Sequence, residues 1–324
     1  MNTLGHIFRL TTFGESHGEA IGGVIDGCPS QLKLDFGFIE SELNRRKTAQ
    51  TETASQRKES DKVEWLSGML DGVTLGTPIA FMVRNEDCKS ADYEALKDIY
   101  RPSHADFTYE QKYGLRDWRG GGRASARTTL PIVVAGAIAK QILKEKNIHV
   151  LAEVAFMGDA EQARKEGDTV GGIVECRITG VPAGLGEPMF GKFSAELAHA
   201  MFSLPAVKGF EIGDGFALAQ MKGSEVNDTI IIKDDKITTL TNHSGGIQGG
   251  ITNGNDIVFR VAFKPIPSIA QSQQTVNRAG ETCTIAIEGR HDVCALPRAV
   301  VLVEALAAMV TLDMGMKQST KKHS

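Results

Sequence analysis

The stretch RGGGRASARTTLPIVVAGAIA, residues 119–139, joins a glycine- and arginine-rich loop to a strongly apolar segment. Three consecutive glycines allow a positive φ without strain and let a ligand approach the backbone closely. Arginines at positions 116, 119, 123 and 127 surround them, and guanidinium groups fit phosphate and carboxylate oxygens two at a time. Pro131 suits only a first helical turn, so we expect a helix to begin near Thr129, after irregular backbone over 123–128. The stretch predicts an anion-binding loop at the entrance to a core helix.

The chain of 324 residues is 41% hydrophobic and carries a net charge of −4, which allows one large domain or two ordinary ones. A general nucleic-acid binder usually has a basic excess, which is missing here. The five cysteines form no CxxC pair, so we expect reduced thiols in a cytoplasmic protein. The N-terminal region does not read as a signal peptide, and the apolar runs 130–139 and 305–310 are shorter than a membrane span.

Outward from the opening stretch, the two halves of the chain repeat a pattern. IGGVID at 21–26 has a counterpart in VGGIVE at 170–175, and each is followed by a helical pattern, at 35–46 and 194–202. Each half then ends in a glycine-rich loop and an apolar helix, at 131–143 and 297–309. We predict a mixed α/β or α+β fold in one domain, an internal duplication with halves of about 1–150 and 151–316, and helices packed outside the sheets. Residues 317–324 read as a polar tail.

Shorter elements are expected between these landmarks. Strands are predicted over 7–11, 23–26, 63–70 and 73–83, and a short helix over 92–99. The polar segment 47–62 is either a solvated surface loop or a basic lid over an anionic ligand.

Several basic side chains fall on predicted loops or at helix ends, and together they suit a small ligand with several phosphates or carboxylates. They are Arg45, Arg46, Arg116, Arg123, Arg127, Lys264 and Arg290. His17 and His104 could exchange protons near neutral pH, although a histidine in the position of His104, taken alone, is more often a structural hydrogen-bonding residue than a catalyst. Asp292 is a candidate partner or base. The combination favours an enzyme over a binding module.

Other catalytic and binding motifs are missing from the sequence. It has no GxGxxG after a strand, no GxxxxGK[ST], no GxSxG, no HExxH and no clustered Cys/His set. We therefore expect neither a Rossmann or P-loop nucleotide site, nor a serine elbow, nor a bound metal.

Seven motifs in fixed order resemble those of the chorismate synthase family along nearly the whole chain. They are FGESHG (13–18), DGCP (26–29), RPSHADFTYEQKYGLRDWRGGGRASAR (101–127), GVPAGLGEP (180–188), AVKGFEIGDGF (206–216), NHSGGIQGGITNG (242–254) and GRHDVCALPRAV (289–300). The resemblance implies a homotetramer of a βαβ sandwich fold. It also implies a lyase of the shikimate pathway that eliminates phosphate from 5-enolpyruvylshikimate 3-phosphate, a small-molecule substrate, with reduced FMN. NADPH would be bound only if the protein reduces its own flavin.

The resemblance also implies roles for individual residues. His17 and His104 match histidines proposed to protonate the reduced flavin and the leaving phosphate, and Asp292 matches an aspartate proposed to help remove the ring proton. FMN contacts would map to Arg123, Ala124, Ser125, Pro205, Ala206, Gly249, Lys264, Pro265, Ile266, Pro267, Ser268 and Arg290. Substrate contacts would map to Ser16, Arg45, Arg46, Arg116 and Arg127, with Arg46 matching a basic position linked to substrate or NADPH.

The chain departs from the family's usual pattern at Glu52, Pro205, Pro267 and Val293, and Pro131 is unusual. The alternative to an enzyme is a non-catalytic protein that binds phosphorylated metabolites or RNA through the arginine–glycine loop. The negative net charge argues against the RNA form.

Overall fold

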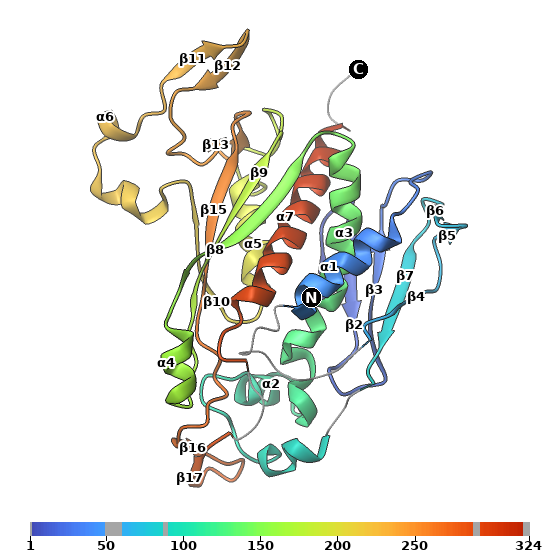
Figure 1. Ribbon diagram of the computed structural model, residues 1–324, viewed down its shortest axis with the longest axis vertical. Helices are drawn as coiled ribbons and strands as arrows, with labels where there is room; N and C mark the ends of the chain where they lie inside the picture. The colour runs from blue at the N-terminus through green and yellow to red at the C-terminus, as the bar shows by residue number, and fades with distance from the viewer. Residues whose placement is uncertain (1, 49–59, 87–89, 288–291, 320–324) are drawn as a thin grey trace.

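The computed structural model describes residues 2–48, 60–86, 90–287 and 292–319. Two antiparallel sheets form its frame (Figure 1). The first sheet has the order β1 (Thr3–Leu4), β2 (Arg9–Phe13), β3 (Ala20–Asp26), β7 (Ile79–Arg84) and β4 (Val63–Trp65). The second has the order β10 (Val207–Ile212), β15 (Ile257–Phe263), β9 (Gly172–Thr179) and β8 (His149–Met157).

The two sheets share one connectivity. Four strands of the first sheet lie in the order β2-β3-β7-β4, and the second sheet repeats that order as β8-β9-β15-β10. A helix follows the second strand of each set, α1 (Phe36–Thr48) in the first and α5 (Phe193–Phe202) in the second. A longer helix follows each completed sheet, α3 (Leu130–Lys144) and α7 (Leu296–Ser319). This correspondence supports the duplication hypothesis; the division into halves stays a prediction.

The long helices lie between the sheets, and this corrects part of the predicted arrangement (Figure 1). The mixed α/β fold is confirmed, but the expectation that helices cover the outside of the sheets is wrong. Helix α3 packs on α7 and on β3, while α7 packs on β8 and β9. The physical reason is composition, because α3 and α7 are buried on nearly every side and need cover from two layers.

Local sequence explains the central contacts. The strand β15 alternates cleanly, with Ile257, Phe259, Val261 and Phe263 buried. Helix α3 begins at Leu130 after Thr129 as its N-cap, with proline in its first turn, as the position of Pro131 predicts. In the middle of that helix, a Cβ added to Gly136 would lie 2.3 Å from the Cβ of Ala305, so α3 and α7 touch through their backbones.

The remaining elements are short and lie around this frame. They are the hairpins β5 (Met69–Leu70)–β6 (Val73–Thr74), β11 (Ile230–Lys233)–β12 (Lys236–Thr239), β13 (Ile247–Gln248)–β14 (Ile251–Thr252) and β16 (Gln273–Val276)–β17 (Thr282–Ile285), the helices α2 (Asp106–Tyr113), α4 (Ala160–Lys165) and α6 (Gly223–Val226), and the 3-10 turns η1 (Ser90–Leu96), η2 (Arg119–Ala124), η3 (Ala126–Thr129) and η4 (Gly215–Gln220). The predicted strands over 63–70 and 73–83 are each broken in two. Gly68 and Gly76 turn the chain there with φ of 83° and 80°.

Helix α7 is apolar and long enough, by length and composition alone, to cross a membrane. However, 83% of its most apolar window is buried inside the protein, which is the behaviour of a core helix. The four cysteines that the structure describes, Cys28, Cys176, Cys283 and Cys294, are free thiols, as predicted. Most of the polar segment 47–62 lies outside the described residues.

Candidate active site

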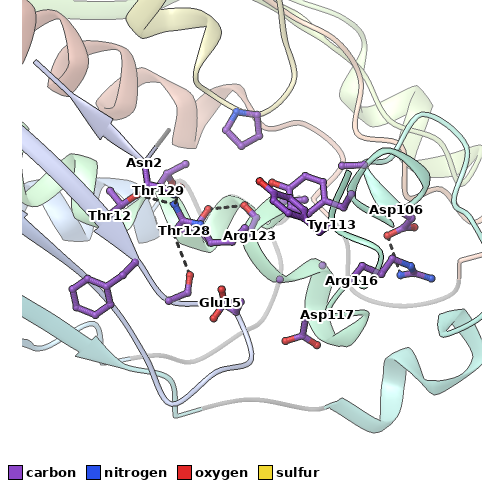
Figure 2. A pocket seen from close by; sticks show the side chains of 18 of the residues that line it. Asn2, Thr12, Glu15, Asp106, Tyr113, Arg116, Asp117, Arg123, Thr128 and Thr129 are labelled. Atoms are coloured by element: carbon purple, nitrogen blue, oxygen red, sulfur yellow. Dashed lines mark hydrogen bonds and ion pairs between the residues drawn. The ribbon is translucent and has the colours of Figure 1, made fainter. Parts of the chain in front are cut away.

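Two cavities meet beside the glycine loop. The β2-side cavity, about 1200 Å³, is lined by residues of β2, α2 and η2, and Figure 2 shows part of its lining. The α7-side cavity, about 890 Å³, is lined by residues of η2, η3, the segment 263–268 and the first turns of α7. His104, Tyr109, Arg123, Ala124 and Thr129 line both cavities. The wall between the two cavities is therefore built from segments that the sequence singles out.

The three consecutive glycines bring the two candidate histidines to one loop. Gly120, Gly121 and Gly122 have φ of 59°, 81° and 52°, which other residues adopt only with strain. A Cβ on Gly120 would lie 2.3 Å from His17 Cδ2, and one on Gly121 would lie 3.5 Å from His104 Nε2. Neighbouring glycines thus lie beside different imidazole rings, and the His17 ring leaves no room for a side chain at Gly120.

The ring of His104 is held by a buried aspartate. His104 Nδ1 lies 2.9 Å from Asp106 Oδ1, and Asp106 also pairs with Arg101 and Arg116. Burial alone would raise the pKa of Asp106, but hydrogen bonds from Arg101 and His104 outweigh it and hold that pKa well below its usual range. Burial lowers the pKa of His104, with Asp106 opposing and Arg101 adding to the shift. These shifts favour the anionic form of Asp106 and the neutral form of the His104 ring.

A second buried ion network lies at the edge of the α7-side cavity. Asp61 accepts hydrogen bonds from Arg46 NH2 at 3.0 Å and from Arg127 NH1 at 2.8 Å. Arg127 Nε also donates to Asn85 Oδ1 at 2.6 Å. Among the described residues, Arg46 Nε is buried without a hydrogen-bond partner. Two buried guanidinium groups and, at 3.8 Å, the ammonium group of Lys47 share this carboxylate, so cations outnumber anions at this edge of the cavity among the described residues.

The second half of the chain completes the α7-side cavity. Lys264 Nζ donates to the Ser103 carbonyl at 2.8 Å, and burial together with Lys208 lowers the pKa of Lys264. Asp292 pairs with Arg298, with 3.2 Å between Oδ2 and Nε. Ala206, beside Pro205, has a φ of 68°, a strained conformation that tends to occur at functional sites. Of these residues, all except Lys208 line the α7-side cavity.

Most predicted site residues line one of these cavities, but several do not. Ala124, Ser125, Pro205, Ala206, Lys264, Ile266, Pro267, Ser268 and Asp292 line the α7-side cavity. Within the described residues, Pro265 and Gly249 line neither cavity, and Gly249 lies in the turn between β13 and β14. Ser16 is buried with its hydroxyl donating to the Gly120 carbonyl at 2.9 Å. Arg290 lies outside the described residues.

Three predicted anion-binding arginines have protein partners instead. Arg45 pairs with Glu42 and Glu304, away from both cavities. Arg116 donates to Asp106 and to the carbonyls of Leu96, Lys97 and Ile99, so it braces the loop before α2. Arg123 reaches back to the Gly14 carbonyl and the Thr12 hydroxyl, and Figure 2 shows it pointing toward β2. Their roles in ligand binding stay predictions.

The sequence interpretation missed three contributors. Asp61 stands in a polar run where nothing marks it, and Asn85 follows a strand without any motif. Arg298 could have been predicted from the sequence, because it lies six residues after Asp292, directly after Pro297, within the motif GRHDVCALPRAV. Its position at the start of an apolar helix that mirrors α3 is a usable signal.

Comparisons with known proteins agree with this geometry. The sequence model described as chorismate synthase matches residues 8–162 and 155–316. A chorismate synthase of Porphyromonas gingivalis is 51% identical, with 97% of this chain and 95% of the relative covered. One from Parabacteroides distasonis is 49% identical, with both chains covered completely. A crystal structure of chorismate synthase has a TM-score of 0.76 at 29% identity, covering 97% of this chain and 93% of the other. The chain belongs to the chorismate synthase family.

Proposed function

We propose that this protein converts 5-enolpyruvylshikimate 3-phosphate to chorismate and phosphate with reduced FMN. Membership of the family supports this reaction, and one observation on the structure of this chain supports it independently. His104, Asp292, Lys264 and the Arg46–Asp61–Arg127 network all line the single α7-side cavity. That set combines proton-exchanging groups with a positive excess, which a phosphorylated carboxylate substrate requires.

The same cavity fits a flavin phosphate. Four small residues line this cavity and leave space for a flat ring system: Ala124, Ser125, Ala206 and Ser268. Lys264 supplies a positive charge, and Arg46 Nε is a buried hydrogen-bond donor without an acceptor among the described residues. Ala124, Ser125, Ala206, Lys264 and Ser268 would hold the flavin. When bound, reduced FMN supplies a transient electron to an elimination that has no net redox change.

The protein's own residues would bind the substrate and manage its protons. Arg46 and Arg127 would orient its anionic groups beside Asp61, which holds both guanidinium groups in place. As the carbon–oxygen bond to phosphate breaks, His104 would deliver a proton to the departing oxygen from Nε2. Asp292, positioned by Arg298, would assist removal of the ring proton on carbon, so that both bonds break and a new double bond forms.

The assembly and location belong to the same proposal. We propose a cytoplasmic homotetramer, as the family resemblance implies; Gly249 lines neither cavity of its own chain, so the flavin contact implied for it would be made to a neighbouring copy. Light scattering in solution measures the mass, and a monomer would contradict this assembly.

Whether NADPH also binds is testable by mixing it anaerobically with the protein and oxidised FMN and following flavin bleaching.

The decisive experiment mixes the protein anaerobically with reduced FMN and 5-enolpyruvylshikimate 3-phosphate. Chorismate absorbance and phosphate release should rise together, and the absence of both would reject the proposal.

We expect His104→Ala to lower turnover about 10²-fold or more, as for loss of a general acid. Thermal unfolding of the variant serves as a folding control, and turnover near that of the wild type would remove His104 from this role.

A further inference from the structure

The imidazole of His104 meets two opposite charges at one nitrogen. Nδ1 lies 2.9 Å from Asp106 Oδ1 and 3.0 Å from Arg101 NH2. A protonated Nδ1 can donate only to the carboxylate, whereas an unprotonated Nδ1 can accept only from the guanidinium. In a neutral ring, the outcome at Nδ1 decides whether Nε2 accepts or donates a hydrogen bond.

The carboxylate of Asp106 cannot turn away from this position. Its Oδ2 accepts from the Arg101 backbone N–H at 3.1 Å and from Arg101 Nε at 2.7 Å, and its Oδ1 accepts from Arg101 NH2 at 2.9 Å. Arg116 NH1 donates to the same Oδ1 at 3.2 Å, while its NH2 is fixed by three backbone carbonyls. The side chains of Asp106, Arg101 and Arg116 are 3%, 5% and 6% exposed, so solvent does not compete for them.

The opposite edge of the ring faces the ligand space. Nε2 lies beside Gly121 in the loop, and His104 lines both cavities. Among the described residues, Arg116 adds positive charge near the ring, Tyr109 and Arg123 line the same two cavities, and Lys264 binds the neighbouring Ser103 carbonyl. Gly121 lines the β2-side cavity and His104 lines both, so an anion bound beside this loop would meet Nε2 among cations.

We propose that Asp106 is a positioning residue that keeps a proton on Nδ1 of His104, so that the proton exchanged with a ligand is carried on Nε2. Arg101 opposes this effect of Asp106, because its guanidinium group also lies within hydrogen-bonding distance of Nδ1 and its positive charge disfavours the imidazolium form until an anion binds. The ring then takes a proton from solvent at Nε2 and gives it to the departing phosphate oxygen. The catalytic use of that proton rests on the proposed function, whereas the tautomer is inferred from the 2.9 Å between Nδ1 and the fixed Asp106 Oδ1.

The test is a pH titration of the protein labelled with ¹⁵N-histidine, with the His104 signals assigned by their loss in His104→Ala. In the wild type, we expect the neutral ring to carry its proton on Nδ1. Asp106→Asn should move the neutral ring to the Nε2–H tautomer and lower the pKa of His104, whereas Arg101→Gln should keep Nδ1–H and raise that pKa. Turnover of Asp106→Asn should fall roughly tenfold to a hundredfold, the range typical of groups that orient a functional histidine.

Opposite shifts distinguish this role from a merely structural one, which would move both variants alike. An Nε2–H tautomer in the wild type, or an unchanged tautomer in Asp106→Asn, overturns the proposal. If Asp106→Asn does not fold, Arg101→Gln decides, and a pKa that fails to rise is a rejection. His243, whose Nδ1 lies 2.6 Å from Asp214, provides the control: Asp214→Asn should change the His243 signals only. An inactive wild type with Nδ1–H would reject the proposed function and leave this inference standing.

Discussion

Arg45 and Arg46 are consecutive residues of α1, yet they belong to different ion networks. Arg45 joins the core network, in which it and Lys140 pair with Glu42 and Glu304 between α1, α3 and α7. Arg46 joins the cavity network, in which it and Arg127 share Asp61. Among the described residues, the core network has two cations and two anions, whereas three cations, Arg46, Arg127 and Lys47, approach the single carboxylate of Asp61 in the cavity network. Balanced charge holds helices together, while an excess of positive charge beside the cavity is what a bound anion can neutralise.

Removing the charge of Glu304 should have the largest effect. Glu304 is 1% exposed on its side chain, binds Arg45 Nη1 at 2.6 Å and also accepts from the Ala152 backbone N–H at 3.0 Å. Glu304→Gln would leave Lys140 with an incomplete buried partner set, so we expect about 3–5 kcal/mol less free energy of unfolding. Urea unfolding measures this, and a loss below about 1 kcal/mol would show that the core network is not a stabilising device.

The paired variants Arg46→Met and Arg45→Met should separate the two networks. Arg46→Met should weaken binding of 5-enolpyruvylshikimate 3-phosphate by about 1.5–3 kcal/mol, the range for hydrogen bonds to charged groups. Arg45→Met should leave that affinity unchanged and lower stability instead. Calorimetric titration with the substrate measures the first effect and urea unfolding the second. Loss of substrate affinity in Arg45→Met, with none in Arg46→Met, would show that the charge balance of a network does not indicate its function.

Alanine variants of Gly120 and Gly114 test whether the space beside His17 matters for turnover in addition to backbone strain. Gly120 and Gly114 both have positive φ, 59° and 72°, so alanine should cost each about 1–2 kcal/mol of stability. A Cβ would lie 2.3 Å from the His17 ring at Gly120, but within 4 Å of nothing at Gly114. We therefore expect turnover to collapse only in Gly120→Ala. Equal turnover in both variants would mean that His17 moves aside without consequence.

The sequence predicts the parts of this molecule that depend on local rules. Pro131 locates the start of α3, and the glycine run predicts the positive φ values beside the two histidines. The placement of whole layers was not predictable in this way. Helix α3 is apolar on most of its surface, which indicates burial but not whether a sheet lies on one side or both. Likewise, both arginines of α1 carry the same charge, and only their distant partners Glu304 and Asp61 assign them to different networks.

The acid side of the pH profile should show the smallest effect and sharpen the comparison. Burial raises the pKa of Glu304, but hydrogen bonds and charge from Arg45 and Lys140 outweigh burial, so the net pKa is lowered. A lowered folded-state pKa means that the stabilisation is present above the ordinary glutamate pKa and is lost as pH falls through the folded value. The difference in unfolding free energy between wild type and Glu304→Gln should therefore shrink below about pH 4.5, by at most about 1.4 kcal/mol per pH unit. Urea unfolding of both proteins at pH 7, 5 and 4 measures it. A difference that stays constant over this range would mean that Glu304 contributes through shape and hydrogen bonding rather than through its charge.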